Sequence, residues 1–177
     1  MNAVDIDRAM TRLAGEVAER ARGEDSASRL AIVGIRRGGV HLASRLRARL
    51  ARLLGHEPAL GTVDIALYRD DLDEKGAAPV VGPTDVRFPV DGTTILLVDD
   101  VLYTGRTVRA ALDELVDFGR PRRVWLLVLV DRGGRELPIA ADFVGTRLSV
   151  EPQDDVQVRL TEGGAPQDAV IVTRRAP

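Results

Sequence analysis

The segment that most constrains this chain runs from Ile95 to Thr107 and reads ILLVDDVLYTGRT. Its first four residues are branched and apolar, which is typical of a strand buried on both faces of a parallel sheet. Two carboxylates, Asp99 and Asp100, follow directly, and a short loop then leads into a helical pattern that ends near Phe118. In an open α/β sheet, ligands bind beyond the carboxyl ends of the strands. The segment therefore predicts an α/β fold with a ligand site where this strand ends.

The loop after the acidic pair has the features of a phosphate site. Gly105 permits close approach of the backbone, Thr104 and Thr107 supply hydroxyl donors, and the first amides of a helix carry partial positive charge. Carboxylates beside a phosphate would repel it, so we expect Asp99 and Asp100 to face hydroxyl groups or Mg²⁺ on the same ligand. A sugar phosphate meets both requirements.

ILLVDDVLYTGRT resembles the phosphoribosyl pyrophosphate (PRPP) motif of type I phosphoribosyltransferases. Two further segments, Asp64 to Leu72 and Leu129 to Gly145, are similar to the family of bifunctional pyrimidine operon regulators and uracil phosphoribosyltransferases. The resemblance covers nearly the whole chain. It implies a central, mostly parallel sheet flanked by helices, with a small hood and a flexible lid loop. It also implies transfer of ribosyl phosphate from PRPP to uracil, giving UMP and diphosphate in the presence of Mg²⁺.

The resemblance implies a role for each part of the site. Asp99 and Asp100 would hold the ribose and stabilise its developing positive charge, and Arg69 at the base of the lid would add a cation. The expected substrate-binding residues are the pyrophosphate loop Arg36, Arg37, Gly38 and Gly39, the 5′-phosphate loop Val101, Leu102, Tyr103, Thr104, Gly105, Arg106 and Thr107, and the base-end pair Asp131 and Arg132. Mg²⁺ would be held through PRPP, with Asp99 or Asp100 as a further candidate ligand.

Three of these assignments have a second interpretation from the residues alone. The loop from Arg36 to Gly39 is either a pyrophosphate loop or an ordinary strand-to-helix turn with exposed arginines. The segment from Asp73 to Pro89 is rich in glycine, proline and charge, and is either a lid or a surface hairpin. Arg106 either contacts the ligand or faces outward from its helix.

Composition limits the remaining classes. The 177 residues suffice for one α/β domain, which we expect to span residues 1–177. The net charge of -2 predicts neither nucleic-acid nor membrane binding for the chain as a whole. Cysteine is absent, which fits a cytoplasmic protein, and no signal peptide or membrane-length apolar run is evident. His41 and His56 are the only histidines and have no partner pattern, so a metal site or a histidine triad is not expected.

Apolar periodicity places the other elements. Predicted helices are Asp5 to Arg22, Val40 to Leu54 and the run after Thr107, with Leu53 and Val116 among the inward residues; predicted strands are Leu30 to Ile35, Leu60 to Leu67, Val124 to Val130, Asp142 to Gly145, Val156 to Leu160 and Ala169 to Thr173. The last three strands are short and are expected to form edge structure or a small cap.

The resemblance also implies binding of pyrimidine operon mRNA. Arg8 and Arg12 on the first helix, and Arg45 and Arg49 with Arg52 on the outer face of the second, are the candidate contacts. Such a stripe is either a solvated helix surface or a face that contacts phosphates.

Three positions depart from the family on the surface associated with RNA. The family tends to have histidines where this chain has Gly15 and Gly134, and an arginine where it has Ala140. Their absence removes direct contacts to RNA, each worth roughly 1 kcal/mol.

The sequence as a whole leaves two hypotheses: a uracil phosphoribosyltransferase that also regulates the operon, or a weakly catalytic or non-catalytic RNA-binding regulator that senses UMP and PRPP. The family resemblance further implies a homodimer or a higher homo-oligomer.

Overall fold

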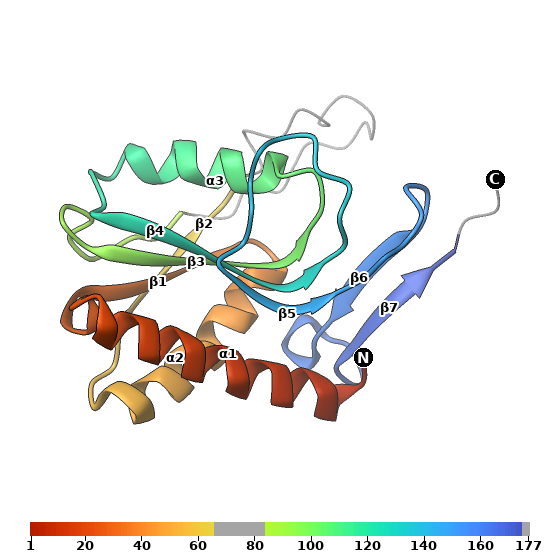
Figure 1. Ribbon diagram of the computed structural model, residues 1–177, viewed down its shortest axis with the longest axis horizontal. Coiled ribbons are helices and arrows are strands. Elements are labelled where there is room, and N and C mark those ends of the chain that lie inside the picture. Colours follow the sequence, from red (N-terminus) through yellow and green to blue (C-terminus); the bar gives the residue numbers. More distant parts are fainter. Residues whose placement is uncertain (66–83, 175–177) are drawn as a thin grey trace.

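The computed structural model describes residues 1–65 and 84–174 (Figure 1). The predicted catalytic cation Arg69, most of the segment from Asp64 to Leu72 and most of the expected lid lie outside the described residues. The elements are α1 (Ala3–Gly23), η1 (Ala27–Arg29), β1 (Leu30–Ile35), α2 (Gly38–Leu54), β2 (Ala59–Val63), β3 (Thr94–Leu102), α3 (Arg106–Val116), β4 (Arg123–Asp131), β5 (Phe143–Arg147), β6 (Asp155–Arg159), η4 (Thr161–Gly163) and β7 (Ala169–Thr173).

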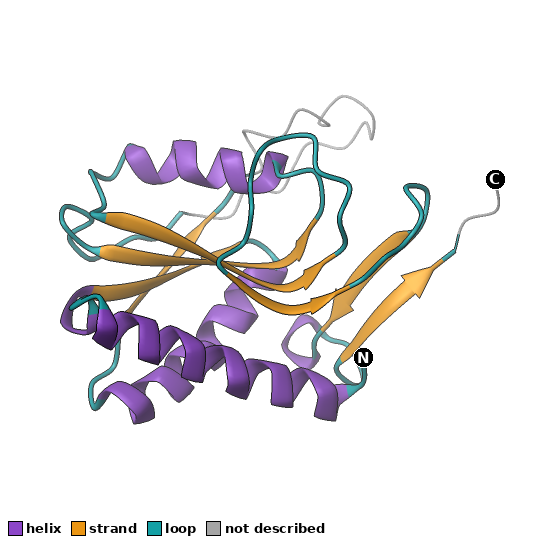
Figure 2. Ribbon diagram, in the orientation of Figure 1, coloured by secondary structure: helices purple, strands orange, loops and turns teal. Residues whose placement is uncertain are grey.

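A five-stranded parallel sheet forms the centre of the fold, in the order β2-β1-β3-β4-β5. Helices α1 and α2 cover one face of the sheet and α3 covers the other (Figures 1 and 2). The predicted α/β class is therefore confirmed. Strand β2 is added on one side of β1, whereas β3, β4 and β5 are added on the other side. Open α/β sheets bind ligands at such a switch point, here between β1 and β3.

Helix α1 shows how local sequence sets an element. The Asn2 side chain accepts a hydrogen bond from the Asp5 amide, and the Asp5 side chain accepts one from the Asn2 amide, which forms a capping box. This cap starts the helix at Ala3, two residues before the predicted start. The predicted inward face is confirmed, because its members are all fully buried: Ile6, Met10, Leu13 and Val17.

Strand β3 is longer than predicted. The sequence indicated an end at Val98, but the strand continues through both aspartates to Leu102. The reason is the neighbouring strand: Val101 pairs with Val130 and Leu102 pairs with Asp131, so β4 supplies ladder partners beyond the acidic pair. The two carboxylates therefore lie on rigid, paired backbone and not on a loop.

Two inward assignments on helices are wrong. Leu53 is 43% exposed and Val116 is 66% exposed. Leu53 lies in the last turn of α2, just before the C-cap Gly55, and Val116 is the last residue of α3. At the end of a helix, the apolar repeat of the sequence can extend past the last residue that packs against another element. The side chain then fits the repeat but is exposed.

The C-terminal strands form a separate antiparallel pair, which we call the ribbon (β6 and β7). Its buried side chains Val156 and Val170, with Leu160 just beyond β6, join the core cluster that also contains α1 and α2 residues. The ribbon lies beyond the arrowheads of β3, β4 and β5, beside the N-terminus (Figure 2). It matches the expected cap. Among the described helices, none has the length and apolar character needed to cross a bilayer.

Candidate active site

The two glycines that start α2 lie against the acidic end of β3. A Cβ atom added to Gly38 would lie 2.2 Å from Oδ2 of Asp100, and one added to Gly39 would lie 2.2 Å from the carbonyl oxygen of Val98. Only glycine permits this approach. The predicted pyrophosphate loop and the predicted ribose carboxylates are thus brought together, although about 60 residues separate them in the chain.

The acidic pair is largely removed from solvent. Asp99 is 4% exposed, and its Oδ1 accepts a hydrogen bond from the Asp100 amide at 2.9 Å. Oδ1 of Asp100 accepts one from the Val101 amide at 2.9 Å. Burial raises the pKa of Asp99, and the neighbouring Asp100 charge raises it further. Burial also raises the pKa of Asp100. Two carboxyl groups in this environment favour a cation or hydroxyl donors as their ligand.

The 5′-phosphate loop forms a helix N-terminus. Gly105 is the N-cap of α3 with φ +94°, a left-handed conformation that favours glycine. The amides of Arg106 and Thr107 begin the helix, and Oγ1 of Thr104 accepts a hydrogen bond from the Arg106 amide at 3.3 Å. A helix start of this kind binds anions through its amides and its dipole. The Arg106 guanidinium pairs with Glu136 at 2.8 Å, which fits the outward-facing interpretation of this side chain.

Arg135 holds the 5′-phosphate loop through its carbonyls, and the sequence analysis did not identify this residue. Its Nη1 donates to the Tyr103 carbonyl at 2.7 Å and its Nε donates to the Ile139 carbonyl at 3.0 Å. The Thr104 carbonyl accepts from the amides of Glu136 and Leu137, each at 3.0 Å. These contacts fix the carbonyls of the 5′-phosphate loop. The available signal was the i,i+4 spacing of Asp131 and Arg135, which form an ion pair at 2.6 Å.

Asp131 lies where strand β4 ends, as predicted, and its carboxylate already has protein partners. Partial burial opposes ionisation, but hydrogen bonds from Arg135 and from the Gly133 amide lower the pKa of Asp131 below its ordinary value. It is therefore an ionised group at neutral pH. A direct contact to the base stays a prediction.

Arg132 is buried, with 8% exposure, and it links two walls of the site. Its guanidinium stacks over the Tyr103 ring at 4.0 Å. Its Nη atoms donate to the carbonyls of Asp154 at 2.7 Å and Glu151 at 3.0 Å. These contacts support a positioning role, whereas the sequence predicted a contact with substrate.

Gly134 leaves room for the Tyr103 ring. Its φ is +73°, and an added Cβ would lie 2.4 Å from Cε2 of that ring. Of the other two positions that depart from the family, Gly15 faces open space on α1 and Ala140 is exposed.

The arginines of the predicted pyrophosphate loop are exposed, at the end of β1. The Arg36 amide donates to the Val63 carbonyl at 3.0 Å, which ties the loop to β2. The peptide bond between Arg36 and Arg37 is cis. Both side chains are exposed at the same sheet edge as the acidic pair.

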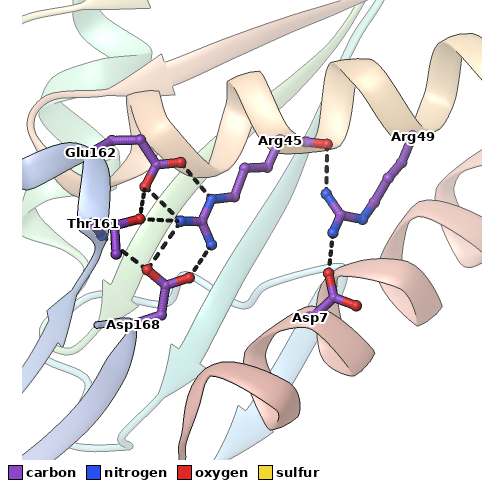
Figure 3. A network of polar contacts seen from close by, with 6 residues as sticks. All are labelled: Asp7, Arg45, Arg49, Thr161, Glu162 and Asp168. Carbon is purple, nitrogen blue, oxygen red and sulfur yellow. Dashed lines mark hydrogen bonds and ion pairs between the residues drawn. The ribbon is translucent and has the colours of Figure 1, made fainter. Parts of the chain in front are cut away.

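The predicted outward arginine stripe is wrong for two of its members. Arg45 pairs with Glu162 and Asp168, and Arg49 pairs with Asp7 of α1 (Figure 3). Both side chains face packed elements, because α2 packs against α1 and against η4.

The first helix shows a similar pattern. Arg12 pairs with Glu16 at 2.6 Å and donates to the carbonyls of Val144 at 3.0 Å and Gly145 at 2.8 Å. Arg8 is exposed on the same helix. Of the five candidate RNA contacts, Arg8 and Arg52 are therefore the two for which the described residues show no partner within the chain.

Few of the described side chains are grouped so that they could bind a metal ion. Within residues 1–65 and 84–174, no group of three or more histidine, aspartate or glutamate side chains could hold a metal ion. Asp99 and Asp100 can supply one or two carboxylate oxygens. That number suits Mg²⁺ that is bound mainly by phosphate oxygens of a substrate, and does not suit an all-protein cage.

The fold and the site agree with a family comparison. The phosphoribosyl transferase domain matches residues 2–161. The crystal structure of the hypoxanthine phosphoribosyltransferase of Trypanosoma cruzi superposes with a TM-score of 0.73 over 99% of this chain and 95% of that chain, at 18% identity, so it supports the fold alone. The chain belongs to the phosphoribosyltransferase family.

Relatives of higher sequence identity assign the chain to one group within the phosphoribosyltransferases. The bifunctional protein PyrR of a Roseiflexus strain is 51% identical over 174 residues, covering 98% of this chain and 93% of the relative. The bifunctional protein PyrR of Listeria monocytogenes is 47% identical over 177 residues, with 98% and 95% covered. That of Thermus aquaticus is 51% identical over 162 residues, with 92% and 88% covered. Within the phosphoribosyltransferases, the chain therefore falls in the PyrR group.

Proposed function

We propose that this chain transfers the 5-phosphoribosyl group of PRPP to uracil, forming UMP and diphosphate, and that it regulates a pyrimidine operon through mRNA. The observation that carries the enzymatic part is the contact between Gly38 and Asp100, beside the N-terminus of α3. A glycine loop in contact with a carboxylate, on the strand that leads to a glycine-capped helix start, supports this assignment. The PyrR relatives support the choice of uracil and the second role.

Each part of the site binds a different group of PRPP. The amides from Gly105 to Thr107 bind the 5′-phosphate, Asp99 and Asp100 bind the ribose hydroxyls, and the loop from Arg36 to Gly39 binds the pyrophosphate. The bond from C1′ to the pyrophosphate oxygen breaks, the bond from C1′ to uracil N1 forms, and the N1 proton passes to the departing pyrophosphate or to water. Positive charge develops on the ribose, and two carboxylates fixed on a paired strand stabilise it.

Mg²⁺ fits this arrangement as a substrate-bound ion. When bound, it would offset the negative charge of the leaving pyrophosphate. Asp99 or Asp100 would supply an oxygen to it. The pyrophosphate loop contributes backbone amides and the cations Arg36 and Arg37 to the same charge.

A direct assay tests the enzymatic part. Purified protein is incubated with PRPP, Mg²⁺ and each of uracil, orotate, hypoxanthine and guanine, and nucleotide formation is measured. We expect turnover with uracil alone. Turnover with a purine base would contradict the assignment, and so would the absence of turnover with all four bases.

The second candidate function is a weakly catalytic or non-catalytic regulator that binds RNA and senses UMP and PRPP. The exposed Arg8 on α1 favours a basic contact, whereas the internal pairing of Arg12, Arg45 and Arg49 reduces the basic surface. The uracil assay decides between the two candidates, because only the first predicts substantial turnover. RNA affinity measured at increasing salt tests the RNA contact that both share, because phosphate contacts weaken steeply as salt rises. Affinity that does not change with salt would count against a basic RNA face.

We also propose that residues 1–177 form one domain and that the protein assembles as a homodimer or a larger homo-oligomer. Sedimentation equilibrium of the purified chain measures the assembly. A monomer over the whole working concentration range would contradict it.

A further inference from the structure

The segment that leads into the ribbon, residues 151–154, lies beside Tyr103 of the 5′-phosphate loop. Arg132 joins the segment before β6 to the Tyr103 ring, through the carbonyls of Glu151 and Asp154. The Tyr103 hydroxyl donates to the Pro152 carbonyl at 3.5 Å. This segment therefore forms a wall of the site beside Tyr103, and we assign the base to the side that it covers.

Apolar packing holds the ribbon less firmly than it holds α2. Helix α2 has Leu42, Ala43 and Leu46 fully buried, each with 0% exposure. The buried apolar residues of the ribbon and of the turn that follows β6 are Val156 at 8%, Leu160 at 4% and Val170 at 9%. With less apolar area in the core, the position of the ribbon depends more on its polar contacts.

Arg45 supplies the densest of these polar contacts (Figure 3). Its Nε donates to Glu162 at 2.7 Å, its Nη2 donates to Glu162 at 2.5 Å and to Asp168 at 3.1 Å, and its Nη1 donates to Asp168 at 2.5 Å. One guanidinium thus engages two carboxylates, each in a bidentate manner. Planar pairing of this kind gives geometric specificity as well as energy.

The acceptors lie in the connection between the two ribbon strands. Glu162 is in η4, and Asp168 directly precedes β7. Oδ1 of Asp168 also accepts a hydrogen bond from the Thr161 amide at 2.9 Å, so it closes the connection onto itself. The Arg45 and Asp168 side chains are only 20% and 13% exposed, so water screens this pair less than an ordinary surface ion pair.

We propose that Arg45 is a positioning residue for base binding, which anchors the ribbon to the helix that begins with the pyrophosphate loop. The proposal rests on the proposed function. Arg45 lies seven residues after Gly38 on α2, so one rigid helix carries both the pyrophosphate loop and the anchor of the ribbon. The anchor sets the distance between that loop and the ribbon.

Loss of the anchor should therefore affect one substrate more than the other. The core fixes α2, so the pyrophosphate loop keeps its place, whereas the ribbon gains freedom. We expect Arg45→Gln to raise the KM for uracil about tenfold and to change the KM for PRPP less than about twofold. Arg45→Lys should recover part of the loss, because lysine keeps the charge without the planar fork.

The experiment compares Arg45→Gln and Arg45→Lys with a matched control, Arg47→Gln, on the same helix. Arg47 pairs with Glu57 at 3.2 Å and donates to the Pro58 carbonyl at 2.9 Å, so its described partners are outside the ribbon. Both KM values, Tm and amide hydrogen exchange of residues 155–173 are measured for each full-length variant. The proposal expects faster exchange in the ribbon and a raised KM for uracil in Arg45→Gln alone. Should Arg45→Gln fail to fold, Glu162→Gln removes one of the two carboxylates and is measured in its place.

Two results would overturn the proposal. A lower Tm with both KM values and ribbon exchange unchanged would make Arg45 a stabilising ion pair only. An equal rise in the two KM values would place its effect on the pyrophosphate loop. If the wild-type protein does not use uracil, the proposed function fails by itself; the anchor is then judged with the base that the enzyme does use, and unchanged ribbon exchange overturns it.

Discussion

Substitution of Gly38 by alanine would separate the chemistry of the site from its stability. The new Cβ would start 2.2 Å from Oδ2 of Asp100. Carbon–oxygen contacts are normally about 3.3 Å or longer, so the carboxylate must move by about 1 Å. The obstructing atoms belong to the Asp100 side chain: its carboxyl group can rotate away, and its Cβ, at 2.9 Å, needs only a small shift.

The expected loss is therefore in activity. A displacement of about 1 Å at a reacting group lowers kcat/KM by roughly 100-fold. The Tm should change little, because alanine in the first turn of α2 is a better helix former than glycine by about 1 kcal/mol. Gly39→Ala is the informative contrast, since its Cβ would lie 2.2 Å from the backbone oxygen of Val98. Backbone cannot rotate away, and overpacking of about 1–3 kcal/mol would lower Tm by about 2–12 °C.

Steady-state rates with uracil and PRPP, together with thermal unfolding, measure both effects. Gly15→Ala is the control, because its Cβ would meet nothing within 4 Å and it lies within α1. It should raise Tm slightly and leave turnover unchanged. Wild-type kcat/KM in Gly38→Ala would refute the reasoning, because the contact between this loop and Asp100 would then have no part in catalysis.

Three further predictions follow from the same contacts. Burial raises the pKa of Asp99 in the folded state above its unfolded value, so its contribution to stability is present below about pH 4 and is lost as pH rises through the folded pKa. Asp99→Asn should therefore have a higher Tm than the wild type at pH 8 and a similar Tm near pH 3. A lower Tm at pH 8 would contradict this. Asp100→Asn should abolish nearly all turnover while the protein stays folded by circular dichroism, and unchanged turnover would remove Asp100 from the mechanism. Arg135→Met should raise the KM for PRPP at least about tenfold, because it frees the Tyr103 carbonyl and leaves Asp131 without its partner; an unchanged KM would show that the phosphate loop holds its shape unaided.

Local pattern was sufficient for most of the framework. The first strand, Leu30 to Ile35, was predicted with the observed bounds, and so was the last, Ala169 to Thr173. Short apolar runs and turn residues act over a few positions, and both strands depend on little else. The length of β3 and the exposure of Leu53 and Val116 depended on neighbouring elements, so local pattern misjudged them.

The sequence by itself determined the chemistry that the chain carries: a buried strand, two carboxylates and a glycine-containing helix start must lie together, because they are consecutive in the chain. The tertiary structure alone decided which distant residues support that chemistry. Arg135 reaches the Tyr103 carbonyl, Arg45 reaches the ribbon, and Gly38 approaches Asp100 only because the strands pair in one order and register. Charged side chains of the same type look alike in sequence, and only packing determines which of them face solvent and which find a partner.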